Sequence, residues 1–323
     1  MNGILSVLKP PGMTSHDVVD VIRRLAGLRR VGHTGTLDPG AAGVLVCCLG
    51  RATRLSEFLT DADKEYRVEL RLGMRTTTGD SYGAPLSPPE GGVRRPVTRA
   101  AFENVLRRFT GEILQVPPMV SAIHHEGTRL YRLARRGEEV ELQPRPVVVH
   151  RIEVVWADRD WMRILLHVAC GKGTYIRKLC VDIGEALGAG GYAHFMVRTR
   201  AGRFTLEDAA TLEELDALAR QGTLAQALST MDQAVAHLPA IDLPDRSVSE
   251  VLHGHPVPLW TVRDAGAGGT SADTLAQEDA PVRLRSRRGA LIALARVERG
   301  LLRPFKVLAG GEETAVAHRV RPR

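Results

Sequence analysis

The sequence has little cysteine, and what it has shows no metal-site pattern. Its 323 residues include four cysteines, Cys47, Cys48, Cys170 and Cys180, all within apolar stretches. Cys47 and Cys48 are neighbours on an expected strand, so their side chains point to opposite faces and do not share an ion. We therefore expect buried, reduced thiols and no metal site.

The sequence also lacks membrane and export signals. No stretch reaches the roughly 18 apolar residues that a membrane-spanning helix needs. The N-terminal residues, MNGILSVLKPPGMTS, lack the basic segment and long apolar run of a signal peptide. We expect a soluble, cytoplasmic protein with no membrane partner.

Positive charge is what the sequence has in excess. Its 44 Lys and Arg residues against 37 Asp and Glu residues give a net charge of +7 and a pI near 9.6. Such a surplus favours a polyanionic partner, because each neutralised phosphate releases counterions. The hydrophobic share of 44% supports a sizeable core, and the length allows one large domain with a smaller one.

Apolar spacing predicts strands and helices that mix without a regular βαβ rhythm. The expected strands lie over residues 4–8, 44–49, 64–72, 147–156 and 161–169, the last two paired. The expected helices lie over residues 98–109, 174–188 and 211–221, and between an N-cap at Ser15 and a stop at Gly27. No GxGxxG opens a helix after a strand, so a Rossmann fold is disfavoured.

The C-terminal part differs in texture from the rest. From about residue 240 to 309, the short runs VPLWTV, ALIALARV and FKVLA are broken by glycines, which predicts a small β-domain. Residues 84–96 have the composition of a loop, and residues 264–281 are a low-complexity segment that we expect to be mobile.

The segment richest in chemical information is GHTGTLDPGAAG, residues 32–43. Its four glycines and one proline predict a tight, preset backbone that can press against a ligand. Two polar groups with chemical capacity, His33 and Asp38, stand on it. The spacing alone leaves open whether Asp38 is a catalytic carboxylate or only caps a turn.

Five blocks of the sequence resemble, in order, the motifs of the bacterial TruB-type tRNA pseudouridine synthases, which modify a uridine in the T-loop of tRNA. These blocks are ILSVLKPPGMTSHDVV, GHTGTLDPGAAGVLVCCLGRATR, KEYRVELRLGMRTTTGDSYG, VPPMVSAIHHEGTRLYRLARRG and GKGTYIRKLCVDIGEALG. The resemblance implies an α+β fold with a mixed, largely antiparallel central sheet flanked by helices. It also implies an isomerase that converts uridine 55 of tRNA to pseudouridine without a cofactor.

The resemblance assigns catalytic roles to three residues. Asp38 matches the catalytic aspartate, which would act as a nucleophile. Arg177 matches an arginine that pairs with it, and Tyr66 matches a tyrosine that stacks on the target base and handles a proton. Arg177 also falls in the expected first turn of a helix, where the macrodipole disfavours a cation, so an anion is expected nearby. Whether Asp38 adds to C1′, adds to C6 or removes a sugar proton stays open.

Four further positions match substrate contacts: His33, Tyr175, Met196 and Arg132. Arg132 belongs to the RNA-contacting thumb, which the resemblance places at about residues 117–146. Lys9 is expected to support the active-site loop rather than to touch RNA.

Two departures from the family pattern weaken expected phosphate contacts. Val197 stands where the family usually has an arginine, and His124-His125 stand where it commonly has lysine.

The same resemblance divides the chain and names its partner. Residues 1–238 match the catalytic domain, residues 239–310 resemble a PUA-type RNA-binding domain, and residues 311–323 are expected to be a disordered tail. The expected partner is the T-arm of tRNA, and the expected state is a monomer with no obligate protein partner.

Two other functions remain as alternatives. One is an RNA-binding or RNA-chaperone protein whose carboxylate is vestigial. The other is the catalytic subunit of a guide-RNA-dependent pseudouridylating particle. A zinc deaminase is excluded because no His-x-Glu occurs with Pro-Cys-x-x-Cys, and a phosphate-loop enzyme is excluded because GKGTY is not GxxxxGK[ST].

Overall fold

The computed structural model describes most of the chain. Described are residues 1–86, 97–119, 140–263 and 279–309, with positions 121, 124–125, 127–130, 133 and 136–138 between the second and third ranges. Several predictions fall outside these residues. They concern most of the expected loop 84–96, most of the thumb including Arg132, the low-complexity segment as far as residue 278, and the tail.

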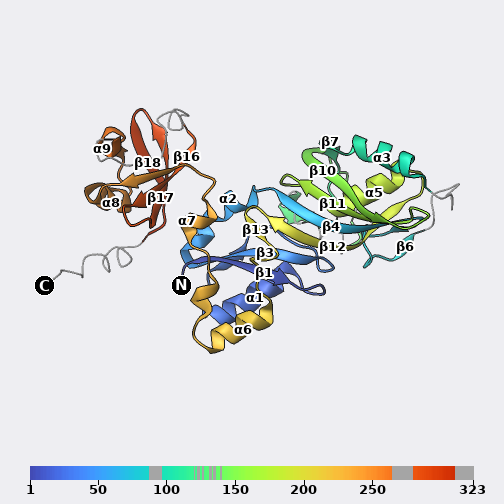
Figure 1. Cartoon of the computed structure of the whole chain (residues 1–323), viewed down its shortest axis with the longest axis horizontal. Coiled ribbons are helices and arrows are strands. Elements are labelled where there is room, and N and C mark those ends of the chain that lie inside the picture. The colour runs from blue at the N-terminus through green and yellow to red at the C-terminus, as the bar shows by residue number, and fades with distance from the viewer. Residues whose placement is uncertain are drawn as a thin grey trace.

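A nine-stranded mixed sheet forms the centre of the molecule (Figure 1). Its order is β1 (Gly3–Lys9), β3 (Ala42–Leu49), β12 (Gly191–Ala201), β4 (Lys64–Leu72), β11 (Arg163–Cys170), β10 (Arg145–Ala157) and β7 (Gly111–Gln115), with β2 (Val31–His33) on β3 and β13 (Phe204–Thr205) on β12. All of these neighbours are antiparallel except β12 and β3. The predicted α+β fold with a largely antiparallel sheet is confirmed.

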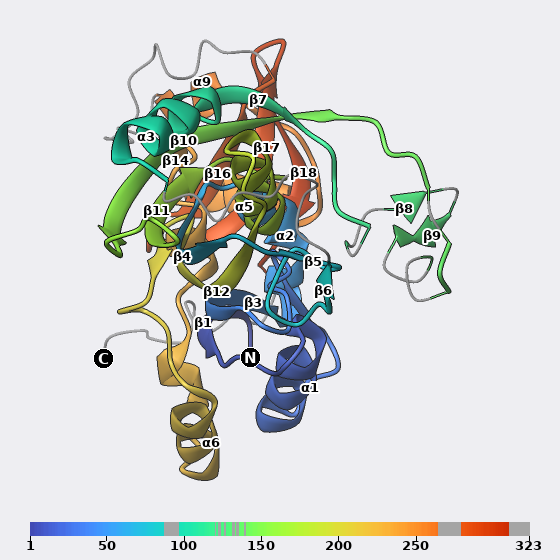
Figure 2. The same ribbon diagram turned by 90° about the vertical axis from the view of Figure 1, so that its right-hand side faces the viewer.

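Helices cover this sheet in two places. α1 (Ser15–Ala26) and α6 (Leu212–Arg220) pack side by side near β1 and β2, and α5 (Ile176–Ala186) packs on β12 and β4 with α3 (Arg99–Arg108) beside it (Figures 1 and 2). The remaining short elements of this part are η1 (Gly50–Leu55), α2 (Ser56–Thr60), β5 (Arg75–Thr76), β6 (Pro85–Leu86), η2 (Leu224–Ala227) and α7 (Met231–Ala234). Figure 2 shows β8 (His124–His125) and β9 (Thr128–Arg129), within the predicted thumb, standing off from the sheet.

The strands follow the hydrophobic pattern of the sequence. β4 alternates buried and half-buried positions along its whole length, as its alternating residues predict. β3 is buried at every position after the first, because it lies between other strands and is covered on both faces.

The start of α1 differs from the prediction. Thr14, not Ser15, is the N-cap: its hydroxyl accepts from the Asp17 backbone N–H, and the Asp17 carboxylate accepts from the Thr14 N–H. The helix ends at Gly27, as predicted, with a left-handed φ of 62°. The Ser15 hydroxyl has a different partner, described with the site.

A second, five-stranded sheet follows in the C-terminal part. Its order is β14 (Ala240–Leu243), β16 (Pro281–Ser286), β17 (Leu291–Glu298), β18 (Leu301–Val307) and β15 (Val257–Pro258), with α8 (Asp245–Leu252) packed on it. The expected strand VPLWTV is wrong after Pro258, because Trp260–Arg263 form the short helix α9. The Thr261 hydroxyl donates to Pro258 O at 2.6 Å, which closes that turn.

The two sheets are packed against each other. Leu291, Leu294 and Leu308 belong to the same buried cluster as Ile4 and Val44 of the central sheet. Polar and aromatic contacts add to this interface. Arg54 Nη1 donates to Val307 O at 2.5 Å, and the rings of Phe58 and Phe305 lie 6.2 Å apart. The second sheet is therefore held beside the edge of the first.

Candidate active site

The glycine-rich loop between β2 and β3 forms a tight turn at Asp38. The Ala41 N–H donates to Asp38 O at 3.0 Å, which closes a four-residue turn with Pro39 at its second position. Gly43 enters β3 with φ of 110°, and a Cβ there would lie 2.2 Å from Arg198 O. The loop therefore requires glycine where it passes β12.

Arg177 holds the Asp38 carboxylate from the first turn of α5. Its Nε donates to Asp38 Oδ2 at 2.6 Å and its Nη2 donates to Asp38 Oδ1 at 3.0 Å. Its Nη1 donates to Thr78 O at 2.9 Å and lies 3.6 Å from Asp80 Oδ2. The Arg177 side chain is 4% exposed and that of Asp38 is 32% exposed. Two parallel contacts thus fix the orientation of a carboxylate that still reaches open space.

That open space is a cavity of about 560 Å³. Five of the predicted site residues line it together: Asp38, Tyr66, Tyr175, Arg177 and Met196. They come from the glycine-rich loop, β4, the start of α5 and β12, so the fold assembles the predicted site from four separate regions of the sequence.

Two predicted site residues are placed differently. His33, half-buried at the end of β2, is not among the residues that line this cavity, and its Nδ1 accepts from the Gly35 N–H at 3.4 Å. Arg132 lies outside the described residues.

Burial affects the ionisation of both tyrosines of the cavity, Tyr66 and Tyr175. Burial raises the pKa of Tyr66, whose ring is 8% exposed, so it is a neutral phenol at neutral pH. Burial also raises the pKa of Tyr175. The buried Gln115 side chain accepts from the Tyr175 N–H at 2.8 Å and donates to Tyr175 O at 3.1 Å, which fixes the backbone there.

Lys9 supports the turn at Asp38 from β1, as the sequence predicted. Its fully buried ammonium donates to Pro10 O at 2.8 Å, Pro39 O at 3.3 Å and Ala41 O at 2.7 Å. Burial, together with Arg198, lowers the pKa of Lys9 to about 8. The turn is therefore held by a buried ammonium group whose lowered pKa lies not far above neutral pH.

Arg198 holds the same loop from β12, and sequence reasoning missed this role. Its side chain is 2% exposed, its Nε donates to Val44 O at 2.7 Å, and its Nη2 donates to Gly35 O at 2.9 Å. Arg198 also lines the cavity. The signal was present, because Arg198 is two residues from Met196 on one strand, and such residues share a face.

Ser15 and Asp80 were missed as well. The Ser15 hydroxyl accepts from the Leu37 N–H at 2.8 Å and donates to Leu37 O at 3.0 Å, which is why Thr14 caps α1 instead. Asp80 lies beside Arg177, in the block similar to the tyrosine motif, but nothing in its local pattern indicated a role.

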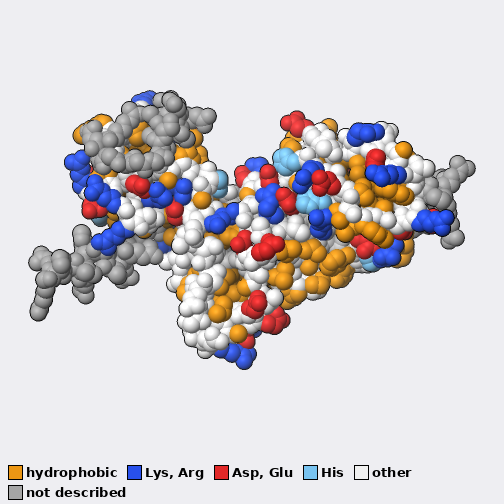
Figure 3. All heavy atoms as spheres, in the orientation of Figure 1, with side chains coloured by type: hydrophobic (Ala, Val, Ile, Leu, Met, Phe, Trp, Pro, Cys, Tyr) orange, Lys and Arg blue, Asp and Glu red, His pale blue; other side chains and the backbone are white. Residues whose placement is uncertain are grey.

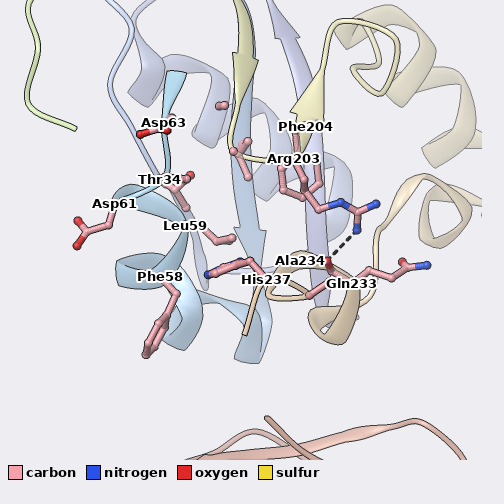
Figure 4. Close-up of a pocket in the computed structure, with 15 residues that line it drawn as sticks. Thr34, Phe58, Leu59, Asp61, Asp63, Arg203, Phe204, Gln233, Ala234 and His237 are labelled. Atoms are coloured by element: carbon pink, nitrogen blue, oxygen red, sulfur yellow. Dashed lines mark hydrogen bonds between the residues drawn. The ribbon is translucent and has the colours of Figure 1, made fainter. Parts of the chain in front are cut away.

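A second cavity of about 710 Å³ lies behind the loop (Figure 4). Its walls include Thr34, Phe58, Leu59, Arg203 and His237, and no predicted site residue lines it. Figure 4 shows Arg203 reaching toward Gln233, whose backbone carbonyl accepts from Arg203 Nη1 at 2.8 Å. The predicted site residues therefore gather at the first cavity and not at the second.

The described part of the chain has neither a metal-binding cluster nor a membrane-spanning helix. Its residues contain no group of three or more His, Cys, Asp or Glu side chains placed to hold a metal ion. They also contain no helix long and apolar enough to cross a membrane. All four cysteines are buried thiols, as predicted, and burial raises the pKa of Cys170 to about 11.

Comparison with known proteins links this geometry to one family. The N-terminal domain model of the TruB family pseudouridylate synthases matches residues 23–176. The model of the tRNA pseudouridylate synthase B C-terminal domain matches residues 177–236.

Curated relatives and solved structures agree with these matches. tRNA pseudouridine synthase B of Moorella thermoacetica is 45% identical over 95% of this chain and 99% of its own length. The enzyme of that name from Pelotomaculum thermopropionicum is 51% identical over 79% of this chain and 80% of its own length. An H/ACA ribonucleoprotein bound to a substrate RNA containing 2′-deoxyuridine includes a chain that is 27% identical, with a TM-score of 0.71, over 95% of this chain and 85% of that chain. A Cbf5-Nop10-Gar1 complex includes one that is 28% identical, with a TM-score of 0.71, over 96% and 86%.

Proposed function

This chain belongs to the TruB family of tRNA pseudouridine synthases and isomerises uridine in tRNA, and we propose that its target is uridine 55 of the T-loop and that Asp38 is its catalytic carboxylate. One observation carries the proposal for Asp38. The carboxylate is held by two contacts to a buried arginine while it faces a cavity lined by two tyrosines.

The cavity suits a single nucleotide turned out of its stack. Its volume of about 560 Å³ lies within the range of small-molecule sites, about 300–1,000 Å³. Extruding a stacked base costs a few kcal/mol. Contacts with Tyr66, Tyr175 and Met196 would offset this cost, since a base stacked on an aromatic ring gains about 1–3 kcal/mol.

The reaction breaks the N1–C1′ bond of the uridine, turns the base and joins C5 to C1′. C5 then gives up its proton, and N1, freed from the sugar, gains one. No atom is lost and no electron is transferred to another molecule, so side chains alone suffice in principle. Asp38 would add to C1′, add to C6 or remove a sugar proton. Each of these routes needs a carboxylate fixed on the cavity wall, and Arg177 provides that restraint. Tyr66, kept neutral because burial raises its pKa, would stack on the base and handle a proton.

Recognition of the T-arm would rest on shape and on phosphate contacts. Figure 3 shows lysine and arginine side chains on both the central and the C-terminal parts of this face. We assign residues 1–238 to the catalytic domain and 239–310 to a PUA-like RNA-binding domain. His33, which does not line the cavity, and Arg132 would also contact the substrate. We further propose a cytoplasmic monomer that needs no cofactor and no protein partner.

The guide-dependent alternative has less support. Relatives named tRNA pseudouridine synthase B reach 45–51% identity, whereas the chains from H/ACA and Cbf5-Nop10-Gar1 complexes reach 27–28%. A guide-dependent subunit assayed alone would be nearly inert on tRNA, and an RNA chaperone with a vestigial carboxylate would bind tRNA without changing it.

One experiment separates these functions. Purified protein is incubated with an unmodified tRNA transcript, and pseudouridine is mapped by carbodiimide reaction or mass spectrometry. We expect the wild-type protein to modify uridine 55. The Asp38→Asn variant should form no product, while its affinity for tRNA stays within about threefold of the wild-type value. Asp20→Asn is the matched control, because Asp20 also pairs with an arginine, Arg23, but on the exposed face of α1. Retention of even about 1% of activity by Asp38→Asn would assign the chemistry to another group.

A further inference from the structure

The loop between β5 and β6, residues 77–84, is anchored beside the candidate active site. The Ser81 hydroxyl donates to His194 O of β12 at 2.8 Å. Asp80 Oδ1 accepts from the Tyr82 backbone N–H at 3.0 Å. These contacts give the loop a defined conformation against the central sheet.

This loop reaches both members of the ion pair. Asp80 Oδ2 lies 3.6 Å from Nη1 of Arg177. On the other side, the ring of Tyr82 lies against Gly40, two residues after Asp38. One short loop therefore contacts the arginine and, through the turn, the aspartate.

The contact between the Tyr82 ring and Gly40 is unusually close. A Cβ on Gly40 would lie 2.3 Å from Cε2, 2.7 Å from Cδ2 and 3.3 Å from Cζ of Tyr82, and these are its three nearest atoms. The φ angle of Gly40 lies outside the left-handed region, so the backbone itself would accept alanine. The ring, rather than the backbone, is what a side chain at this position would meet and displace.

The ring also borders a small recess beside the ion pair. Asp38, Gly40, Asp80, Tyr82 and Arg177 are among the residues around a recess of only about 20 Å³, which is room for roughly one water molecule. Tyr82 is nevertheless 64% exposed, because only one side of it faces the turn.

We propose that Tyr82 is a positioning residue for the reaction. Its ring packs on the turn at Gly40 and thereby keeps Asp38 aligned with Arg177 and the cavity. The inference rests on the proposed catalytic role of Asp38. The ring of Tyr82, and not its hydroxyl, provides the alignment. The alignment serves the chemical step, and not tRNA binding.

Two substitutions at Tyr82 test this assignment. Tyr82→Phe keeps the ring and should keep kcat within about twofold. Tyr82→Ala should lower kcat on the order of ten- to a hundredfold, the scale of a misplaced reacting group, with KM and tRNA affinity within about twofold. An unchanged kcat in Tyr82→Ala would overturn the proposal. A raised KM with kcat retained would also overturn it, because the ring would then serve RNA binding.

A double-mutant cycle with Gly40→Ala tests the contact itself. The single variant Gly40→Ala should lower both Tm and kcat, because the new Cβ meets the ring. In the Tyr82→Ala background, adding Gly40→Ala should lower neither by a comparable amount. Equal effects in the two backgrounds, or no effect in either, would contradict the proposal.

The cycle also separates this proposal from the function on which it rests. Coupling in Tm reports the packing of the ring on the turn whatever Asp38 does. Asp38→Asn, assayed in parallel, reports the catalytic carboxylate alone. Coupling in Tm with an active Asp38→Asn would leave the contact real but remove its catalytic purpose, and the positioning role would then be rejected.

Discussion

Arg177 grips both carboxylate oxygens of Asp38, with Nε at 2.6 Å from Oδ2 and Nη2 at 3.0 Å from Oδ1, although 139 positions separate the two residues. The guanidinium is itself buried and held by Thr78 O. A planar fork of this kind sets the plane of the carboxylate as well as its position, which a single ammonium does not do.

We therefore expect Arg177→Lys to lower kcat by at least about tenfold while tRNA affinity changes less than about threefold. Lysine keeps the positive charge but makes one contact in place of two. Single-turnover pseudouridine formation and filter binding measure the two quantities. Arg75→Lys is the control, since Arg75 pairs with Glu185 near the surface and should tolerate the change. Wild-type kcat in Arg177→Lys would contradict the role of the fork.

Arg198→Lys should damage the site from the opposite side of the loop. The carbonyls of Val44 and Gly35 would lose donors, and a buried acceptor left unpaired costs about 1–3 kcal/mol. We expect a lower Tm by thermal denaturation and a lower kcat. Arg200→Lys, on the same strand but paired with Glu65 near the surface, should change both much less. Equal effects of the two variants would mean that Arg198 serves the strand and not the loop.

The role of Tyr66 can be divided between its ring and its hydroxyl. Tyr66→Phe should keep tRNA affinity, because the ring still stacks, and should slow product formation if the phenol handles a proton. Tyr66→Leu should lose the stacking as well and weaken binding by about 1–3 kcal/mol. A Tyr66→Phe variant with full activity would leave the residue a stacking role alone.

Titration of Lys9 predicts a pH effect. Burial lowers the pKa of Lys9 from 10.5 to about 8, so between these values the unfolded chain binds a proton that the folded chain does not. The contribution of this group to the free energy of unfolding therefore rises with pH across that window. The neutral amine, however, has two N–H donors for three carbonyl acceptors, so one of the three hydrogen bonds that join Lys9 to Pro10 and to the turn at Asp38 is lost.

We expect kcat to fall as pH rises through about 8 without a loss of Tm from this group. This fall in kcat with rising pH should be absent in Lys9→Met, whose kcat should be low at every pH. The measurement is kcat and Tm from about pH 6.5 to 9.5. If kcat of Lys9→Met fell in the same way as pH rises, the titrating group would be another residue.

tRNA affinity should depend steeply on salt. The chain has a net charge of +7, and phosphate contacts release counterions on binding. Between about 50 and about 200 mM salt we expect the dissociation constant to rise more than tenfold, as measured by filter binding. A flat response would mean that few phosphates are contacted.

The sequence predicted the parts of the fold where the conformation of a residue depends mainly on its near neighbours in the chain. The alternation of Tyr66, Val68 and Leu70 defined β4, and Gly27 ended α1 because only a short list of residues adopts its φ. The N-cap was misplaced by one position, since Ser15 binds Leu37, a partner 22 residues away. The VPLWTV run failed because an apolar stretch that short does not separate strand from helix.

The site also has features that the sequence predicted and features that depend on contacts between distant parts of the chain. The resemblance identified Asp38, Tyr66 and Arg177, and the fold does bring them to one cavity. The spacing from Met196 could have placed Arg198 on the cavity face, but its hydrogen bonds to Val44 O and Gly35 O could not be foreseen. They depend on the parallel pairing of β12 with β3, where Val197 lies opposite Ala42. Such a register is set by the whole sheet and leaves no local trace.

Three buried cations converge on the glycine-rich loop: Lys9 from β1, Arg177 from α5 and Arg198 from β12. Two of these residues lie on strands of the central sheet and one on the helix packed against it, and they are far apart in the sequence. Any cut of the chain between β1 and β12 would separate the loop from at least one of them. A fragment that keeps all three donors must therefore include residues 9–198, and grafting the loop alone onto another scaffold would transfer its sequence without the contacts that hold its conformation.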